Sequence, residues 1–148
     1  MRIFSNRKAG YNFSFLEDYE AGIELKGGEI KSIRAGKISF LDSYAKIVDN
    51  QVYLTNLHIS TFEKESWFAT DPKRDRRLLL TKREISKLKK KLLERGFTLV
   101  PKKLYITDRG LAKVTISLAK GKRVYDKRES IKRKDENLRI ARETKKYK

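Results

Sequence analysis

The side chains that most often carry catalysis are scarce in this sequence. It has no cysteine, which excludes thiol catalysis, disulfides and cysteine-ligated zinc. His58 is the only histidine, and neither a catalytic triad nor a zinc site can be assembled around it from the remaining residues. The nucleophile motif G-x-S-x-G and the phosphate-binding motif G-x-x-x-x-G-K-[ST] are both absent from the sequence. We therefore interpret His58 as a structural or ligand-contacting residue rather than a catalytic or zinc-binding one.

Carboxylate pairs are the remaining candidates for chemistry, because two carboxylates can hydrolyse a glycosidic bond or hold a metal ion. The acidic clusters are Glu17, Asp18 and Glu20, then Glu63 and Glu65, and then Asp135 and Glu136. Lys and Arg outnumber acidic residues throughout the chain, so salt bridges explain these clusters more simply than catalysis does. We expect no catalytic residue, no metal site and no cofactor, and we predict that the protein is not an enzyme.

Positive charge is the strongest property of the sequence. Its 37 Lys and Arg residues face 19 Asp and Glu, giving a net charge of +18. A compact body with this charge repels itself, and phosphate backbones reward Lys and Arg by releasing counterions. A membrane surface is the alternative polyanion, but no run approaches the roughly 20 apolar residues of a spanning helix. The N-terminus also lacks the apolar stretch of a secretory signal. We predict a cytoplasmic RNA-binding protein that does not bind membranes.

Four basic segments indicate where RNA could bind. They are residues 6–8, Lys31 with Arg34, residues 73–77 and the C-terminal residues 120–148. Aromatic residues follow the first segment and precede the third, at Tyr11, Phe13, Trp67 and Phe68. Bases can stack on exposed aromatic rings while nearby cations pair with phosphates, so this pattern favours single strands and loops of RNA.

The elements that must position these residues are mainly strands. Alternating apolar residues predict strands at 13–25, 38–48, 52–59, 97–107 and 111–119, with a short buried strand at 78–80. Two helical turns are expected at 29–35. A longer amphipathic helix is predicted at 82–95, opening on a T-x-x-E capping box and ending before Gly96. Its predicted apolar stripe is Ile85, Leu88, Leu92 and Leu93.

The composition changes after Ala119. Residues 120–148 contain 13 Lys or Arg against 5 Asp or Glu, and their apolar residues are too sparse to bury a helix. We therefore predict two parts. Residues 1–119 should form a mainly β domain, a small OB-like closed β-barrel with one amphipathic helix and one short helix. Residues 120–148 should form a basic tail that is disordered alone and becomes helical on a partner.

Seven stretches of the sequence occur in the order typical of one family. They are NRKA at 6–9, YEAGIEL at 19–25, GGEIKSIRAG at 27–36, DSY at 42–44, DPKRDRRLLLTKREI at 71–85, GFTLVP at 96–101 and AKGKRVYDKRESIK at 119–132. Together they resemble the SsrA-binding protein family, also called small protein B or SmpB, along nearly the whole chain. The resemblance implies an OB-like barrel that binds the tRNA-like domain of transfer-messenger RNA (tmRNA). It also implies delivery of alanyl-tmRNA to stalled ribosomes together with elongation factor Tu, without catalysis.

The resemblance further implies which residues carry these interactions. The RNA-binding residues would be Asn6, Arg7, Lys8, Glu20, Lys31, Ser32, Arg34, Leu79 and Thr81. The tail residues that act in the ribosome's decoding centre and mRNA channel would be Gly121, Lys122, Tyr125, Asp126, Lys127 and Arg128. Gly121 would act as the hinge between barrel and tail. A glutamate cannot sit on phosphate, but Glu20 could accept hydrogen bonds from base edges or hold an arginine in place.

Two other functional classes stay open at this point. A ribosomal or rRNA-assembly protein could also combine an OB body with a basic extension, and it would be found on all ribosomes. An RNA-processing enzyme would cleave or modify RNA as a pure protein, which the missing catalytic residues argue against. We expect a monomer whose specific partner is one small structured RNA.

Overall fold

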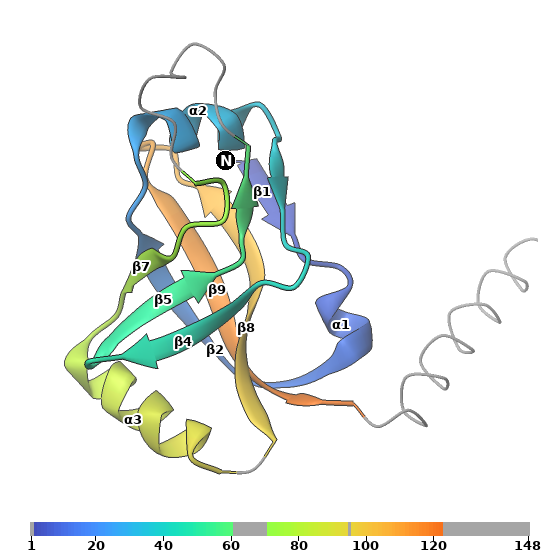
Figure 1. Ribbon diagram of the computed structural model, residues 1–148, viewed down its shortest axis with the longest axis vertical. Coiled ribbons are helices and arrows are strands. Elements are labelled where there is room, and N and C mark those ends of the chain that lie inside the picture. Colours follow the sequence, from blue (N-terminus) through green and yellow to red (C-terminus); the bar gives the residue numbers. More distant parts are fainter. Residues whose placement is uncertain (1, 61–70, 95, 123–148) are drawn as a thin grey trace, which may run out of the picture.

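A computed structural model of the chain describes residues 2–60, 71–94 and 96–122. Twelve helices and strands occur within these ranges (Figure 1). In chain order they are β1 (Arg2–Ser5), α1 (Ala9–Asn12), β2 (Phe13–Ile23), α2 (Gly27–Arg34), β3 (Ile38–Ser39), β4 (Tyr44–Val48), β5 (Gln51–Thr55), β6 (His58–Ile59), β7 (Arg76–Leu79), α3 (Lys82–Leu92), β8 (Phe97–Ile106) and β9 (Ala112–Gly121). The prediction of a mainly β chain is confirmed. In the same ranges, no helix is both long and apolar enough to cross a membrane.

Seven of the strands form one antiparallel sheet whose hydrogen bonding returns on itself. The strand order is β1-β8-β4-β5-β7-β2-β9, and β9 pairs in turn with β8. Strand β8 can take three partners because β9 runs along one of its edges, while β4 and β1 share the other. Strands β3 and β6 form a separate two-stranded sheet. The ring brings strands that are distant in sequence, such as β2 and β9, into continuous register.

The core consists of the residues that these strands turn inward. Val52, Leu54, Leu99, Leu104 and Val114 are fully buried in it. Helices α2 and α3 lie at opposite ends of the sheet and contribute Ile33 and Leu88. Burial of such side chains stabilises the fold by about 1.5–3 kcal/mol each.

The structure divides the strand predicted at 38–48 into β3 and β4. Asp42 lies between them with a positive φ of 59°, and the Ser43 amide donates to the Phe40 carbonyl. This turn interrupts the alternation, so that Leu41 is 62% exposed although Ser43 and Ala45, two and four positions later, are buried. A period-2 pattern holds only while the backbone stays extended, so the sequence pattern did not reveal the break.

The strand predicted at 52–59 is also divided, by Asn56 with a φ of 63°. His58 therefore does not share the buried face of Val52 and Leu54, and is half-exposed in β6. Asp49 and Asn50, between the strands predicted at 38–48 and 52–59, both have positive φ and join β4 to β5 in a hairpin. Two positive φ values are typical of the two-residue turns that match the twist of a hairpin.

Helix α3 begins as predicted, at the capping box. The Glu84 amide donates to Thr81 Oγ1 at 3.2 Å, and the Thr81 amide donates to the Glu84 carboxylate at 3.0 Å. The helix ends at Leu92, however, and Leu93 is 85% exposed, so Leu93 was wrongly assigned to the apolar stripe. Gly96 adopts a φ of +86°, the left-handed conformation that favours glycine after a helix.

The structure contains a helix that the sequence pattern did not predict. Helix α1 has only four residues, too few to produce a helical period, so the prediction of two helices was wrong. Ala9 at its start is 4% exposed and packs with Val100 and Ala119. Strand β9 continues to Gly121, two residues past the predicted domain boundary. The predicted behaviour of the tail from residue 123 onward lies outside the described residues.

Candidate RNA-binding surfaces

Glu20 and Leu79 lie on neighbouring strands and face away from the core. Gly22 of β2 is the register partner of Leu79 of β7, and Ala21 and Ile23 on either side of it are buried. Side chains alternate along a strand, so Glu20 and Gly22 share the outer face with Leu79. A Cβ atom built on Gly22 would lie 3.4 Å from Leu79 Cδ1, so the exposed leucine covers the glycine.

Strands β9 and β8 extend this outer face. Glu20 is the register partner of Thr115, and Gly22 is the partner of Lys113. These two β9 residues are in turn opposite Lys103 and Tyr105 of β8. We call the surface formed by Glu20, Gly22, Leu79, Lys103, Tyr105, Lys113 and Thr115 the outer band. Beside it lies a hollow of about 500 Å³, which Glu20, Lys103, Tyr105 and Thr115 line together with Ser5, Asp18, Tyr19 and Lys102.

Sequence reasoning missed Lys103 and Lys113. Lys113 and Thr115 already alternate with apolar residues in the predicted last strand, so their outward direction was visible. What the sequence lacks is the register between β2 and β9, which separates Glu20 from Lys113 by more than ninety positions along the chain. Only the closed hydrogen bonding of the sheet brings an acidic and two basic side chains to one surface.

The Glu20 carboxylate is available for an outside partner. Its neighbour Asp18 is bound to Lys102 at 3.0 Å, whereas nothing in the ranges that the structure describes forms a hydrogen bond or ion pair with Glu20. Lys103 Nζ lies 5.8 Å from the centre of the Tyr105 ring. An unengaged acceptor beside two lysines and an aromatic ring can bind a base edge while the lysines bind phosphates.

A phenol–carboxylate pair connects the strand of the outer band to α3. The Tyr19 hydroxyl donates to Glu17 at 2.6 Å, and Lys87 of α3 lies 3.6 Å from the same carboxylate. Burial, reinforced by the Glu17 carboxylate, raises the pKa of Tyr19 to about 12. The hydrogen bond from Tyr19 lowers the pKa of Glu17. Tyr19 therefore stays protonated and Glu17 stays charged at neutral pH, so the hydrogen bond between them is kept.

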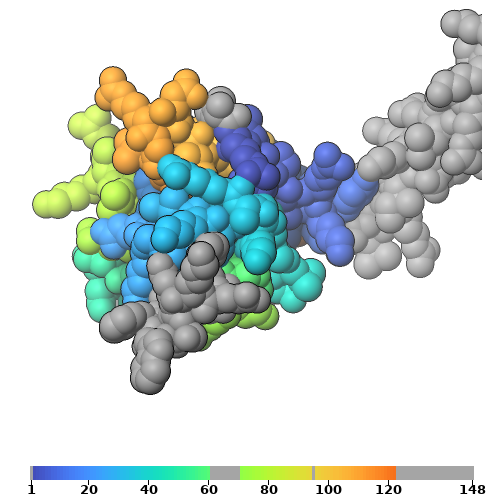
Figure 2. Space-filling view, turned by 90° about the horizontal axis from the view of Figure 1, so that it is seen from above, coloured from blue at the N-terminus to red at the C-terminus, as the bar shows by residue number. Residues whose placement is uncertain are grey.

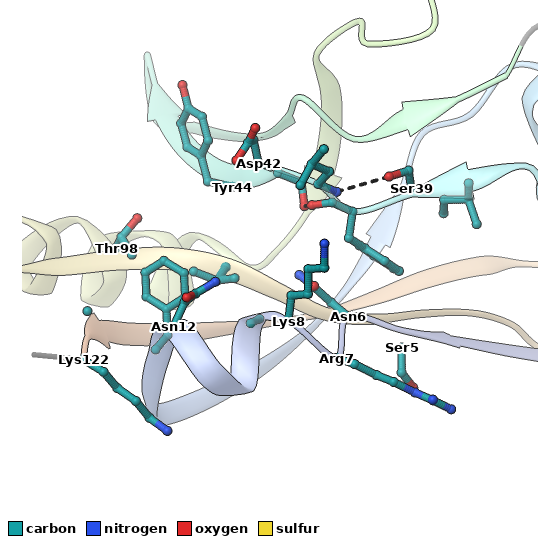
Figure 3. Close-up of a pocket in the computed structure, with 18 residues that line it drawn as sticks. Ser5, Asn6, Arg7, Lys8, Asn12, Ser39, Asp42, Tyr44, Thr98 and Lys122 are labelled. Atoms are coloured by element: carbon teal, nitrogen blue, oxygen red, sulfur yellow. Dashed lines mark hydrogen bonds between the residues drawn. The ribbon is translucent and has the colours of Figure 1, made fainter. Parts of the chain in front are cut away.

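Asn6, Arg7 and Lys8 lie in a different place, along a groove of about 1030 Å³ (Figure 3). The groove also receives Gly121 and Lys122, the first two residues implied for the tail. Figure 3 shows Lys8 pointing into the groove, whereas Arg7 and Lys122 extend away from its centre on opposite sides. Its far wall contains Asp42 and the partly exposed Tyr44. The structure thus brings the N-terminal basic segment together with the root of the tail.

Asn6 itself is engaged in holding the chain. Its side-chain amide donates to the Pro101 carbonyl at 2.8 Å, and its main-chain amide donates to the Lys102 carbonyl at 2.8 Å. Both bonds attach the segment before α1 to β8. Arg7 and Lys8 are exposed and free to meet phosphate.

The α2 residues form a third group, separate from Glu20. Ser32 is fully buried, and its hydroxyl donates to the Ser60 carbonyl at 2.6 Å, so it attaches α2 to the end of β6. Lys31 and Arg34 are exposed. The Arg34 carbonyl accepts a hydrogen bond from the Arg2 guanidinium, and the Arg34 side chain lies close to Gly110. Figure 2, seen from the α2 end, shows the N-terminal strand and the β8–β9 turn meeting beside this helix.

The basic segment at 73–77 is in large part structural, which corrects its prediction as an RNA-binding loop. Arg76 is fully buried and donates to the Glu29 carboxylate at 2.6 Å. Arg74 binds the same carboxylate at 2.5 Å. Burial alone would raise the pKa of Glu29, but the bonds from Arg74 and Lys26 and the charge of Arg76 hold it below its ordinary value. These two arginines are therefore occupied, while Lys73 and Arg77 stay exposed.

Thr81 is exposed and caps α3, directly after the outer band. The remaining implied tail residues, Tyr125, Asp126, Lys127 and Arg128, lie outside the described residues. In the part of the chain that the structure covers, no three His, Cys, Asp or Glu side chains come close enough to hold a metal ion.

Comparison with known proteins places this architecture in one family. The family model described as SmpB protein matches residues 3–146. The chain is 51% identical to the SsrA-binding protein of Pseudothermotoga lettingae over 140 residues, covering 95% of each protein. It is 48% identical to the SsrA-binding protein of Caldicellulosiruptor bescii, covering 98% of this chain and 91% of that one.

A solved structure is similar along most of the fold. It is described as "tmRNA-SmpB: a journey to the center of the bacterial ribosome". Its matching chain is 47% identical in sequence to this chain, with a TM-score of 0.71. The match covers 87% of this chain and 94% of that chain. Since the family model spans nearly all of the sequence and relatives of about half identity span it too, the chain belongs to the SmpB protein family.

Proposed function

We propose that this protein binds the tRNA-like domain of tmRNA and delivers it to stalled ribosomes for trans-translation. Membership of the SmpB family supports this function, as do relatives named for binding SsrA RNA and a solved relative named together with tmRNA and the ribosome. The role is that of a non-enzymatic adaptor. We further propose that the ring-like sheet is an OB-type barrel and that the protein acts as a monomer in the cytoplasm.

The outer band is the surface that we assign to tmRNA. Leu79 is 49% exposed although it is a large aliphatic residue, and an exposed apolar side chain can pack against a base or sugar. Lys113 of β9 and Lys103 of β8, which both lie beyond β2 from Leu79, can bind phosphates. The unengaged Glu20 carboxylate adds an acceptor that discriminates between base edges, which generic cationic attraction cannot do.

We assign the groove beside α1 and the tail that follows it to the ribosome. Arg7, Lys8 and Lys122 give this side of the molecule a cationic edge, and the chain continues from Lys122 into the basic tail. Walls of rRNA phosphate attract such a segment, and phosphate contacts can supply the free energy of ordering it. Elongation factor Tu joins the complex through alanyl-tmRNA, so it requires no surface of its own on this protein.

Glu20→Gln tests the assignment of the outer band. The substitution keeps the shape of the side chain but removes a charged acceptor, and a hydrogen bond to a charged group contributes about 1.5–3 kcal/mol. We expect the dissociation constant for tmRNA to rise at least about tenfold, measured at fixed salt concentration. Glu94→Gln is the matched control, because Glu94 is exposed, and its pair with Lys91 at 3.8 Å lies outside the band.

The control decides between specific and generic binding. Glu94→Gln should leave the affinity for tmRNA unchanged within about twofold. If both substitutions change the affinity equally, or if Glu20→Gln tightens binding to any RNA, Glu20 acts only through net charge and the outer band is not the tmRNA site.

A further inference from the structure

The root of the C-terminal tail is held by α1 through two hydrogen bonds. The Lys122 amide donates to the Asn12 carbonyl at 2.9 Å, and Lys122 Nζ donates to the Gly10 carbonyl at 2.9 Å. Immediately before it, Gly121 is the register partner of Phe13, so β9 stays paired with β2 up to this point. The last described residue of the chain is therefore attached by its main chain and its side chain to the same short helix.

The chemistry of a helix end explains why a lysine binds here. The last carbonyls of a helix have no partner within it, and they carry the negative end of the helix dipole. In α1 the amide after the helix bonds to Ala9, which leaves the Gly10 carbonyl for another donor. A lysine ammonium supplies both the donor and the positive charge.

Helix α1 can act as a fixed support because it is itself anchored to the barrel. Ala9 packs against Val100 of β8 and Ala119 of β9, both almost completely buried. Asn6, just before the helix, is bound to Pro101 and Lys102 as described above. The two carbonyls that receive Lys122 are thereby held in position relative to β8 and β9.

We propose that α1 sets the direction in which the tail leaves the barrel, and that Lys122 is the positioning residue. This inference rests on the proposed function, in which the tail acts in the ribosome while the barrel holds tmRNA. A tethered segment reaches its site more often when its first residue points toward that site, because direction and length determine its effective concentration. The N-terminal NRKA stretch would then serve the tail, by supporting α1, as well as RNA.

Distance measurements test the attachment directly in the full chain. The sequence has no cysteine, so Ser86→Cys on the exposed face of α3 and Val124→Cys in the tail can each be spin-labelled without background. We expect the distribution of distances between the two labels to be at least about twofold broader in Lys122→Met, whose side chain cannot donate to the Gly10 carbonyl. Lys122→Arg restores a donor and should restore the narrow distribution. Lys120→Met removes the same charge two residues earlier and should change nothing.

Activity shows whether the direction matters. Lys122→Met should lower peptide tagging on stalled ribosomes about three- to tenfold, while leaving tmRNA affinity within about twofold of the unsubstituted protein. An unchanged distance distribution, or an equal loss of tagging in Lys120→Met, would overturn the positioning role. So would a loss of tmRNA affinity in Lys122→Met, because Lys122 would then be an RNA contact. The proposed function fails separately, if the unsubstituted protein shows no preference for tmRNA.

Discussion

Glu29 is buried between two arginines, and this arrangement decides how the segment before β7 should be understood. Arg76 places its guanidinium against Glu29 and also donates to the Leu57 carbonyl at 2.6 Å and the Pro72 carbonyl at 3.0 Å. These bonds join α2, the link between β5 and β6, and the segment before β7 around one buried charge pair. At the scale of single residues, charge that appears available for RNA in the sequence can be entirely occupied inside the protein.

Replacing Glu29 should therefore damage the fold rather than a binding surface. Glu29→Gln leaves Arg76 buried without its counter-charge, and breaking one partner of a buried pair costs about 3–5 kcal/mol. We expect this loss in the free energy of unfolding measured with urea. Glu24→Gln is the control, because its pair with Arg77 at 3.6 Å is exposed and contributes less than about 1 kcal/mol. Equal losses in the two variants would contradict the structural role of the buried cluster.

The same pair predicts how stability depends on pH. The pKa of Glu29 is lower in the folded chain than its ordinary value, since the hydrogen bonds from Arg74 and Lys26 and the charge of Arg76 outweigh its burial. Its contribution to stability is therefore complete above the unfolded pKa of about 4.3, and is lost as the pH falls toward the folded pKa. The difference in unfolding free energy between the unsubstituted protein and Glu29→Gln should shrink below about pH 4.3. A difference that stays constant there would show that Glu29 keeps its ordinary pKa.

At the scale of elements, local sequence signals predicted what depends on neighbouring residues. The capping box at Thr81 and Glu84 fixed the start of α3, and the turn at Asp49 and Asn50 fixed the hairpin. Capping and turn formation involve residues three or four positions apart, so their signals lie within a short stretch of sequence. Regular alternation predicted most strands for the same reason.

What the sequence did not predict depends on single backbone conformations and on contacts between distant strands. The positive φ values of Asp42 and Asn56 interrupt two strands. Across Asn56 the apolar positions shift by one residue, from Val52 and Leu54 to Leu57 and Ile59, and alternation alone does not show that a turn causes the shift. Burial of Arg76 requires Glu29, which lies 47 positions away. Likewise, the resemblance to a known family supplied Glu20 and Leu79, but the basic partner Lys113 became visible only with the register of the sheet.

The junction of β2 and β7 offers a test of the outer band that does not alter charge. Gly22 has no side chain, and a Cβ there would make only ordinary contact with the exposed Leu79 side chain. Gly22→Val should therefore fold with unchanged or slightly higher stability, because valine favours strands. Its added bulk should raise the dissociation constant for tmRNA at least about tenfold, since it covers the centre of the band.

Ser14→Val is the matched control for this substitution. Ser14 is exposed on the same strand but pairs with Lys120 near the tail root, outside the band. The Ser14→Val variant should bind tmRNA with unchanged affinity. A Gly22→Val variant that folds and binds tmRNA normally would remove the band from the interface.

At the scale of the whole molecule, the described fold separates two sets of cations. The outer band lies across β7, β2, β9 and β8, whereas Arg7, Lys8 and Lys122 surround the groove at the root of the tail. The outer band lies on the sheet itself, whereas Arg7 and Lys8 lie between β1 and α1, and Lys122 directly follows β9. A molecule built this way can hold one RNA on the sheet while the chain that leaves β9 reaches another.

A truncated chain gives the most direct test of this division. The boundary belongs after Lys122, because β9 continues to Gly121 and Lys122 is bonded to α1. A protein of residues 1–122 and the full chain should be compared for tmRNA affinity and for peptide tagging of stalled ribosomes. We predict a dissociation constant for tmRNA within about threefold of the full chain's, and no tagging. Loss of tmRNA binding together with tagging, or tagging that survives without the tail, would contradict the division of function between sheet and tail.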